Sequence, residues 1–258
     1  MVLAVDIGNS NICIGGLTGA EHCSIQFTMR MVTRPRCTAD EYAAEMKFLL
    51  RRLQVDPAAC EGVIVCSVVP HLTEVLATAC KRLTGQEPLI VSCGLDTGLS
   101  FQVDEPAKVG RDRIADAAAA AAHYPLPCMT VDLGTATTYN VISAQRAFLG
   151  GFIVPGVQTS LRAISAGTAQ LPPIAPAPPE HLIGANTVAA LNNGAMFGTA
   201  AQLDGLADRV ETELGQPLTV VATGGLAPYI MPCCKRKVIY DADLLFKGLA
   251  LIWEKNKR

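Results

Sequence analysis

Two short turns, each built around an aspartate and a glycine, are the part of this sequence best suited to chemistry. Asp6-Ile7-Gly8-Asn9-Ser10-Asn11 and Asp132-Leu133-Gly134-Thr135-Ala136-Thr137 both follow an apolar run. Glycine lets the backbone approach a ligand, and successive N–H groups can bind phosphate oxygens. A carboxylate at a strand end can hold a cation or its water ligands. Either turn alone could be a polar hairpin, but the pair predicts binding of a nucleotide triphosphate from two lobes.

A third candidate, Gly110-Arg111-Asp112-Arg113, stands at the start of the alanine-rich run 113–123. An aspartate just before a helix is a good N-cap, which would be a purely structural role. Alternatively, Asp112 accepts a hydroxyl proton while a neighbouring arginine stabilises substrate or phosphoryl charge. The spacing leaves both interpretations open.

Two glycine-rich runs are weaker signals. The run 150–156 leads toward an expected helix at 157–165, and Thr223-Gly224-Gly225 follows an expected strand at 218–222. Each could allow close approach of a ligand or could simply connect a strand to a helix. Patterns typical of P-loop NTPases, Rossmann dehydrogenases and α/β-hydrolases do not occur in the sequence, which argues against those three classes.

The composition is that of a globular protein. The chain has 258 residues, 50% of them apolar and 17% charged, with a net charge of −2. This balance gives no general attraction to nucleic acid or to an anionic membrane, and no apolar run reaches the roughly 18 residues of a spanning helix. The ten cysteines form no C-x-x-C pair, so neither a zinc site nor disulfides are expected. The N-terminus has no signal-peptide pattern, and we expect a cytoplasmic protein.

Short strands alternate with helices, which predicts an α/β fold. A capping box, Thr38-Ala39-Asp40-Glu41, marks the start of one helix. The expected strands are 2–7, 11–17, 62–67, 88–92, two flanking the Asp132 turn, and 218–222. The expected helices are 39–53, 71–83, 113–123, 157–165, one beginning at 187, another at 200–214, and 242–255, with a proline-rich loop at 171–179.

The opening pattern of strand, aspartate turn and second strand returns 126 residues later, near the middle of the chain. A match of four common residues could arise by chance, but the same flanking pattern at the halfway point favours two similar lobes.

In this order, the motifs resemble those of the type III pantothenate kinases. The resemblance rests on the two aspartate turns, the runs 110–113 and 150–156, and four shorter segments, over about residues 3 to 250. The shorter segments are Ser67-Val68-Val69-Pro70, Thr168-Ala169-Gln170-Leu171-Pro172, Gly184-Ala185-Asn186-Thr187 and Thr223-Gly224-Gly225. No single motif is decisive, but eight in order are highly specific.

The resemblance implies an actin-like α/β fold of the acetate and sugar kinase superfamily. Its two ribonuclease H-like lobes would be 1–115 and 116–258, with a nucleotide cleft between them. It further implies transfer of the ATP γ-phosphoryl group to the 4′-hydroxyl of pantothenate, the first step of coenzyme A biosynthesis. Mg²⁺, a monovalent cation (K⁺ or NH₄⁺) and a homodimer also follow from the resemblance alone.

The resemblance also assigns roles to single residues. Those expected to bind ATP are Asp6, Ile7, Gly8, Asn9, Ser10, Asn11, Ile12, Cys13, Thr135, Gly224 and Gly225. Those expected to bind pantothenate are Gly110, Arg111, Asp112, Arg113 and, across the dimer, Thr187. Asp112 would accept the proton, Asp6 would support Mg²⁺ through water, and Asp132 would bind the monovalent cation.

Four residues depart from the family pattern, and all are near the expected acceptor site. Arg111 replaces an alanine, Val103 and Glu105 replace a tyrosine and an asparagine, and Asp116 replaces an asparagine. An actin-fold kinase for another small hydroxy acid is therefore an alternative, as is a non-catalytic regulatory relative. The presence of Asp6, Asp112 and Asp132 argues against the latter. The length argues against a filament-forming actin relative.

Overall fold

The computed structural model describes residues 1–19 and 23–257, which form two compact units. The expected lobes were 1–115 and 116–258, whereas the compact units are discontinuous in sequence, and the C-terminal helix belongs to the first. Unit 1 comprises Met1–Leu99, Asp104–Ala122 and Leu244–Arg258, and unit 2 comprises Ser100–Val103 and His123–Asp243.

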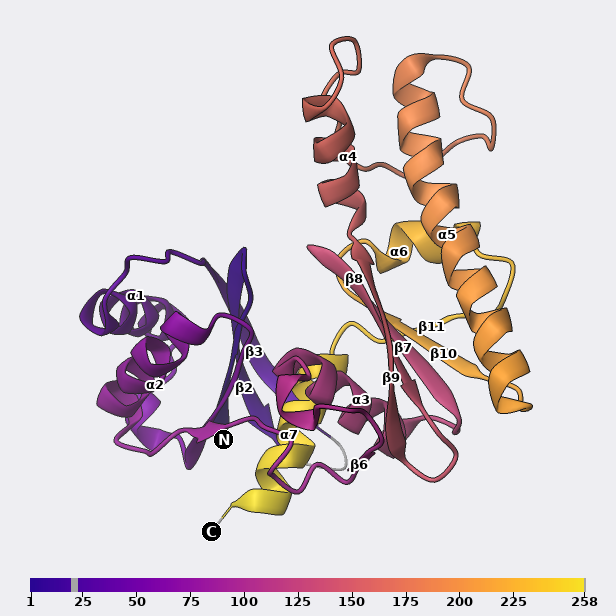
Figure 1. Cartoon of the computed structure of the whole chain (residues 1–258). Helices are drawn as coiled ribbons and strands as arrows, with labels where there is room; N and C mark the ends of the chain where they lie inside the picture. Colours follow the sequence, from indigo (N-terminus) through magenta and orange to yellow (C-terminus); the bar gives the residue numbers. More distant parts are fainter. Residues whose placement is uncertain (20–22, 258) are drawn as a thin grey trace. The chain divides into compact units, whose positions relative to one another are not determined.

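Unit 1 contains a five-stranded sheet in the order β3-β2-β1-β4-β5 (Figure 1). The strands β1, β2 and β3 are antiparallel neighbours, and β4 and β5 continue the sheet parallel to β1. The bounds are β1 Val2–Ile7, β2 Asn11–Thr18, β3 Ser24–Val32, β4 Gly62–Ser67 and β5 Leu89–Ile90. The edge strand β3 was missed in the sequence, although its apolar residues alternate strictly with polar ones, the period expected of a half-buried strand.

Helices α1 (Ala39–Arg52) and α2 (Pro70–Thr84) cover one face of this sheet. The expected capping box is confirmed: the Thr38 hydroxyl accepts a hydrogen bond from the Glu41 backbone, and the Glu41 carboxylate accepts one from the Thr38 backbone at 2.7 Å. The buried cluster beneath these helices takes alternate residues of the strands, among them Val5 and Val65. The intervening residues therefore face the other side of the sheet.

That opposite side is covered by α7 (Leu244–Asn256), on which α3 (Arg111–His123) packs. Two glycines allow the close approach. A Cβ at Gly62 would lie 2.0 Å from the Trp253 ring, and one at Gly248 would lie 2.0 Å from the Ala115 carbonyl oxygen. Both distances are far below van der Waals contact, so these contacts need glycine.

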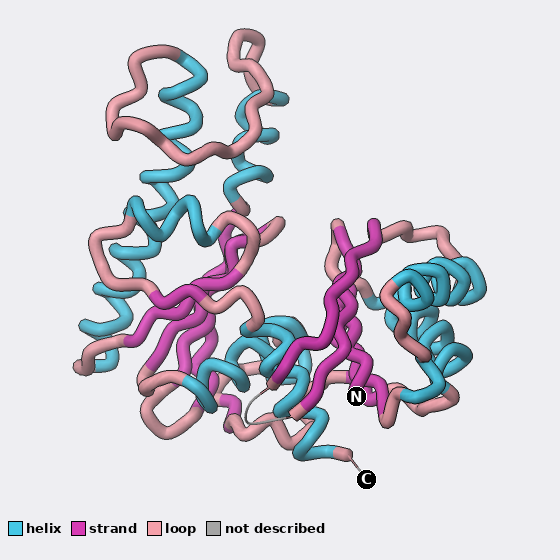
Figure 2. Tube along the Cα trace, turned by 180° about the vertical axis from the view of Figure 1, so that it is seen from behind, coloured by secondary structure: helices cyan, strands magenta, loops and turns pink. Residues whose placement is uncertain are grey.

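Unit 2 repeats the plan of unit 1. Its sheet has the order β11-β10-β7-β8-β9-β6, in which β7, β8 and β9 are antiparallel neighbours and β10 and β11 continue parallel to β7. The bounds are β6 Ser100–Phe101, β7 Cys128–Leu133, β8 Ala136–Ile142, β9 Ala147–Pro155, β10 Thr219–Thr223 and β11 Ile239–Tyr240. Only β6, at the edge, has no counterpart in unit 1. Figure 2 shows the strands of each unit gathered in a sheet of their own. The common order supports the inferred duplication.

The helices of unit 2 are α4 (Val157–Ala166), α5 (Thr187–Leu214) and the short α6 (Ala227–Ile230). The two helices expected from residue 187 onward are one continuous helix of 28 residues. The proline-rich segment 171–179 contains no helix or strand, as expected. Three short 3₁₀ helices complete the described chain: η1 Pro57–Ala59, η2 Pro106–Lys108 and η3 Met231–Cys233. No helix among the described residues is both long and apolar enough to cross a membrane.

The run 150–156 is not the turn that its glycines suggested, since most of it lies in β9. Gly150 and Gly151 have φ of +108° and +154°, and the register shifts opposite them, between Val141 and Ile142. Leu149 is the residue left out of the pairing, so a bulge lies next to Gly150 within the strand, whereas Gly151 pairs regularly with Asn140. A Cβ at Gly151 would also lie only 1.8 Å from the Tyr139 carbonyl oxygen.

Candidate active site

The first aspartate turn joins β1 to β2 and is held closed by hydrogen bonds. The Gly8 N–H donates to the Asn11 carbonyl at 3.0 Å. Thr33, which directly follows β3, donates its hydroxyl to the Gly8 carbonyl at 2.7 Å and its N–H to the Ser10 carbonyl at 3.1 Å. Asn9, Ser10 and Asn11 remain exposed at the tip of the turn. Thr33 thus fixes the loop that was expected to bind phosphate.

Not every residue of the segment 6–13 offers its side chain to a ligand. Ile7 and Ile12 are fully buried and belong to the core beneath α1 and α2, so only their backbone groups could contact a nucleotide. Cys13 pairs with Asp6 across the hairpin and is partly buried. Burial raises the pKa of Cys13, which makes a thiolate there unfavourable.

Asp6 lies beside a buried cysteine of the neighbouring strand β4. The β1–β4 register pairs Cys66 with Asp6, and the Cys66 side chain is fully buried. The charges of Asp112 and Asp116, on α3, also act on this thiol. Burial and these carboxylates raise the pKa of Cys66 well above its ordinary value. Asp6 and Cys66 therefore share the face of the sheet opposite to α1 and α2, and α3 contributes negative charge to the same region.

Asp112 is not the residue before the helix, because α3 begins at Arg111. Its Oδ1 accepts a hydrogen bond from the Arg113 N–H at 2.7 Å within the first helical turn. Burial raises the pKa of Asp112, and the hydrogen bond and the Arg113 charge only partly oppose this. A carboxylate with a raised pKa is a stronger base, which suits a proton acceptor. Burial lowers the pKa of Arg113, while the Asp112 charge opposes that change.

The four residues that depart from the family pattern lie in different surroundings. Glu105 is exposed and forms an ion pair with Lys108 at 2.8 Å. Asp116 is buried in α3, whereas Arg111 is half-buried at its first residue. Val103 belongs to unit 2, where a Cβ at Gly150 would lie 3.7 Å from it.

The second aspartate turn joins β7 to β8 in unit 2. The Thr135 carbonyl accepts hydrogen bonds from the Gly156 N–H at 3.2 Å and from the Thr159 hydroxyl at 2.7 Å. A Cβ at Gly156 would lie 2.3 Å from the Gly134 carbonyl oxygen, so the end of β9 is tightly packed on this turn. The Thr135 side chain remains exposed.

Gly224 packs against the same turn from β10. It has a φ of +91°, and a Cβ there would lie 2.7 Å from the Asp132 carboxylate and 2.8 Å from the Leu133 backbone. Gly225 is exposed, and a Cβ there would meet nothing within 4 Å. Asp132, Thr135 and Gly224 are thus assembled into one site within unit 2.

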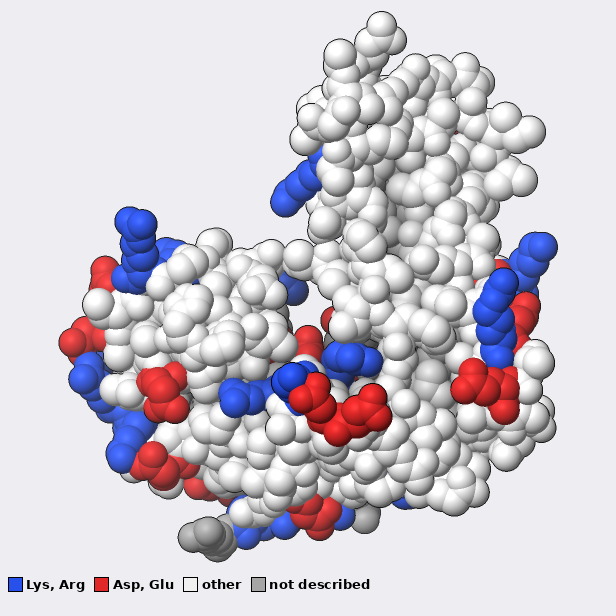
Figure 3. All heavy atoms as spheres, in the orientation of Figure 1, with Lys and Arg blue, Asp and Glu red and all other residues white. Residues whose placement is uncertain are grey.

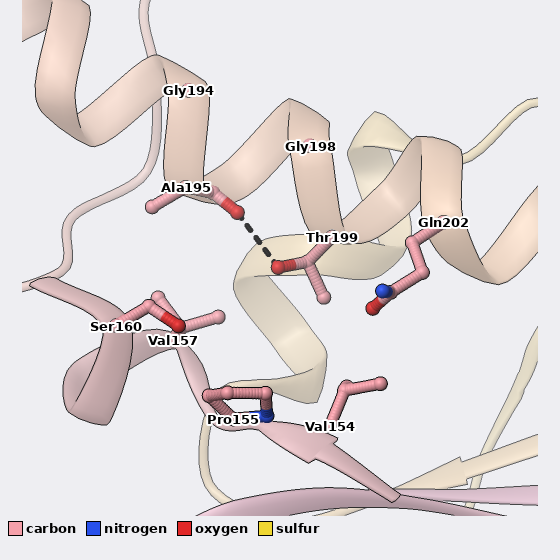
Figure 4. Close-up of a pocket in the computed structure, with 9 residues that line it drawn as sticks. All are labelled: Val154, Pro155, Val157, Ser160, Gly194, Ala195, Gly198, Thr199 and Gln202. Carbon is pink, nitrogen blue, oxygen red and sulfur yellow. Dashed lines mark hydrogen bonds between the residues drawn. The ribbon is translucent and has the colours of Figure 1, made fainter. Parts of the chain in front are cut away.

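Thr187 lies elsewhere in unit 2, exposed at the first residue of α5, which Asn186 caps through a hydrogen bond to the Ala189 N–H at 2.9 Å. A hollow of about 390 Å³ next to it is lined by the loop 174–186 and the start of α5. A second hollow, of about 240 Å³, lies between the β9–α4 corner and α5 (Figure 4). Gly194 and Gly198 leave it open, and it is lined by residues other than those expected to bind a ligand.

Two residues of the site were missed in the sequence. Thr33 had no motif to mark it, and Cys66 looked like one of several small buried hydrophobic residues. Both act through partners distant in the chain. Within the described ranges 1–19 and 23–257, no group of three His, Cys, Asp or Glu side chains has metal-binding geometry.

The fold and the two turns define the class of protein. Solved structures with this arrangement include a ROK family glucokinase from Streptomyces griseus, in complex with glucose and AMPPNP. It covers 98% of each chain with a TM-score of 0.52 at 14% identity. The fold is therefore that of the actin-like sugar kinases, as the sequence predicted.

Sequence comparison then gives the family. The family model of type III pantothenate kinase matches residues 2–209. The type III pantothenate kinase of Exiguobacterium sibiricum is 41% identical over 257 residues, which is 100% of both chains. That of Dehalococcoides mccartyi is 40% identical over 256 residues, 99% of this chain and 98% of its own. The chain belongs to the type III pantothenate kinase family and is an ATP-dependent kinase. This confirms the resemblance carried by the motifs.

Proposed function

We propose that this pantothenate kinase transfers the γ-phosphoryl group of ATP to the 4′-hydroxyl of pantothenate. The observation that carries the proposal is the turn 8–11, closed by Thr33, in the same compact unit as the Asp112 carboxylate in the first turn of α3. Phosphoryl transfer depends mainly on positioning and on charge neutralisation. This arrangement supports a phosphate-binding turn and a proton acceptor in one unit.

In this proposal the turn 8–11 binds phosphate oxygens through its N–H groups and exposed polar side chains, while Thr33 keeps it closed. Asp112 orients the acceptor hydroxyl and takes its proton as the phosphoryl group arrives. Arg111 and Arg113 attract the carboxylate of pantothenate, which suits a guanidinium partner. Gly110 lets the substrate approach the start of α3.

In unit 2, Thr135 and the Gly224-Gly225 turn contact ATP, and Asp132 holds a monovalent cation. The partly exposed Asp132 carboxylate lies against the Gly224 backbone. Its negative charge suits the binding of a single small cation. Exchange of K⁺ for Na⁺ should lower turnover, and Asp132→Asn should remove the difference between the two ions. Equal rates in both ions for the unmodified protein would contradict this role.

Asp6, at the end of β1, also suits Mg²⁺, since its carboxylate supplies a hard oxygen for an ion that keeps several water ligands. Asp6 would hold the ion through water. When bound, Mg²⁺ would neutralise charge on the phosphates.

We further propose that the protein works as a homodimer through unit 2. The surface formed by α4, the loop 167–186 and the start of α5 is nearly free of charged side chains in Figure 3. It exposes large apolar side chains, among them Leu182 (66%) and Ile183 (83%). Exposed apolar patches of this kind mark protein interfaces. A second copy would bring Thr187 near its partner's acceptor site.

The dimer can be tested by light scattering on the purified protein. Ile183→Glu should shift the mass from dimer to monomer, whereas Val32→Glu, at an apolar residue of unit 1 that is 65% exposed, should not. A monomeric unmodified protein would contradict the proposal.

The reaction itself is tested by ADP release from ATP and Mg²⁺ with and without pantothenate, in K⁺ and in Na⁺. Turnover that requires pantothenate and is faster in K⁺ would support the proposal. If ATP binds but pantothenate leaves the rate unchanged, Arg111 and its neighbours would point to another small hydroxy acid.

A further inference from the structure

Two neighbouring asparagines of α5, Asn192 and Asn193, are buried where the proline-rich loop runs beside the helix (Figure 1). Asn192 binds the backbone of one loop residue twice. Its Oδ1 accepts a hydrogen bond from the Ala177 N–H at 3.0 Å, and its Nδ2 donates to the Ala177 carbonyl at 2.9 Å. Asn193 donates to the His181 carbonyl at 2.6 Å and to the Leu182 carbonyl at 3.3 Å. The helix thus holds the loop at two points through side-chain amides.

The loop needs such partners because its sequence limits the hydrogen bonds that its own backbone can make. Residues 171–186 lie in neither helix nor strand, and the prolines at 172, 173, 176, 178 and 179 have no N–H group. Backbone groups that water does not reach must still find partners. An asparagine amide offers both a donor and an acceptor, so Asn192 satisfies both backbone groups of Ala177, as a neighbouring strand would.

The same bonds fix the backbone on either side of Ile183, whose side chain is 83% exposed. The Leu182 carbonyl is bonded to Asn193. On the other side, Gly184 packs on α5 so closely that a Cβ there would lie 2.3 Å from the Ala190 backbone nitrogen. Ile183 is therefore held in solvent on a fixed backbone, at the rim of the hollow between loop and helix. Such a side chain needs little further ordering when a partner covers it, which favours binding.

We propose that Asn192 and Asn193 are positioning residues for assembly, which hold residues 177–183 on α5 in the shape that a second copy of this chain binds. The proposal rests on the homodimer proposed above, whose surface in unit 2 includes this loop. Loss of either amide leaves loop backbone groups without their partners and frees the residues around Ile183. A second copy would then have to order the loop in order to bind, and Thr187 would reach its partner's acceptor site less often.

The competing explanation is that the two amides only stabilise the fold. Asn256 of α7 provides a matched control, because its amide binds the backbone of Asp96 in the same double manner, accepting from the N–H at 3.0 Å and donating to the carbonyl at 2.9 Å. This pair belongs to unit 1, whereas the proposed dimer surface belongs to unit 2. If the amides only stabilise the fold, neither Asn192→Ala nor Asn256→Ala changes the dissociation constant of the dimer.

The experiment measures that dissociation constant by sedimentation equilibrium on the whole protein and on each variant, with folding checked by circular dichroism. Asn192→Ala should raise it about tenfold or more, since fixing the backbone of one freed residue costs about as much as a tenfold change in affinity. Asn256→Ala should stay within about twofold. The KM for pantothenate should also rise in Asn192→Ala at low protein concentration and recover at high concentration, while the KM for ATP changes little.

An unchanged dissociation constant in folded Asn192→Ala would overturn the proposal, as would an equal rise in Asn256→Ala. If Asn192→Ala does not fold, Asn193→Ala replaces it, because the carbonyl groups that it releases belong to exposed residues that water can reach. A monomeric unmodified protein would instead refute the homodimer itself. That outcome is distinct from a stable dimer that is indifferent to both asparagines.

Discussion

The two aspartate turns share a plan but differ in how they are built. Both join antiparallel strands at the centre of a sheet, and both are tied by a threonine that follows the third strand, Thr33 in unit 1 and Thr159 in unit 2. The register separates them. Four residues lie between the pair Ile7 and Ile12, but only three between Leu133 and Thr137. The gapless sequence match therefore conceals a one-residue difference in the hairpins.

Their surroundings differ more. Asp6 pairs with the buried Cys66 of β4, and the charges of Asp112 and Asp116 help to raise the pKa of that thiol. The Asp132 turn is instead packed against backbone, at Gly156 and Gly224. Titratable groups near one turn suit proton transfer, and close-packed glycines near the other suit binding of a ligand to the backbone. The repeated hairpin thus supports two different tasks because its neighbours differ.

Among the tests of these two different tasks, the substitution Asp112→Asn should have the largest effect. If acceptor chemistry belongs to unit 1, kcat should fall by about 10²–10⁴-fold, the usual worth of a positioned base. Asp132→Asn should act mainly on the dependence on monovalent cations and on ATP binding. The exposed Asp104→Asn is the control and should leave kcat unchanged. Near-normal turnover of Asp112→Asn would show that Asp112 is not the proton acceptor.

Gly224→Ala should have the next largest effect. The new Cβ would lie 2.7 Å from the Asp132 carboxylate at a φ of +91°, so both sterics and backbone oppose it. We expect a loss of about 2–3 kcal/mol in the free energy of unfolding, measured with urea, and weaker ATP binding. Gly225→Ala, which meets nothing within 4 Å, should change little. Similar results for both variants would show that the Asp132 turn is not tightly packed.

Much of this arrangement could be predicted because its signals are local. The capping box at Thr38, the strand before Asp6 and the repeat at Asp132 are each contained in a few neighbouring residues. The place of Cys66 beside Asp6 could not be recognised, because it comes from pairing with a strand 60 residues away. Gly150 was misread, because a glycine in a bulge and one in a turn look alike in sequence.

Two further failures concern helices. Two helices were expected from residue 187 onward, but Gly194 and Gly198 are tolerated within one long helix that packs on other elements. The alanine-rich helix was expected to begin at residue 113, after Asp112, but α3 begins at Arg111. Both errors arise because tertiary packing decides where a helix begins and ends more than local preference does.

A smaller effect concerns the stability of unit 1. Burial raises the pKa of Asp112, so the folded protein keeps this proton to a higher pH than the unfolded chain does. The stability contributed by this group is present below its ordinary pKa of about 3.9 and is lost as the pH rises through the raised value. Asp112→Asn should therefore increase the free energy of unfolding by about 1 kcal/mol at pH 7, and not at pH 4. A less stable variant at pH 7 would contradict the burial cost.

The smallest predicted effect tests the two threonine ties directly. Thr33→Val removes a hydroxyl that is partly buried, whereas Thr159→Val removes one that is exposed, and both donate at 2.7 Å. An unmade hydrogen bond costs more where water is excluded, so Thr33→Val should lower the free energy of unfolding by about 1 kcal/mol and Thr159→Val by less. Thr33→Val should also raise the KM for ATP more, because the Gly8 carbonyl loses its partner. Urea unfolding and ATP titrations check both points. Equal losses in the two variants would mean that the two turns are held alike, and that the contrast between the units lies only in the groups around their aspartates.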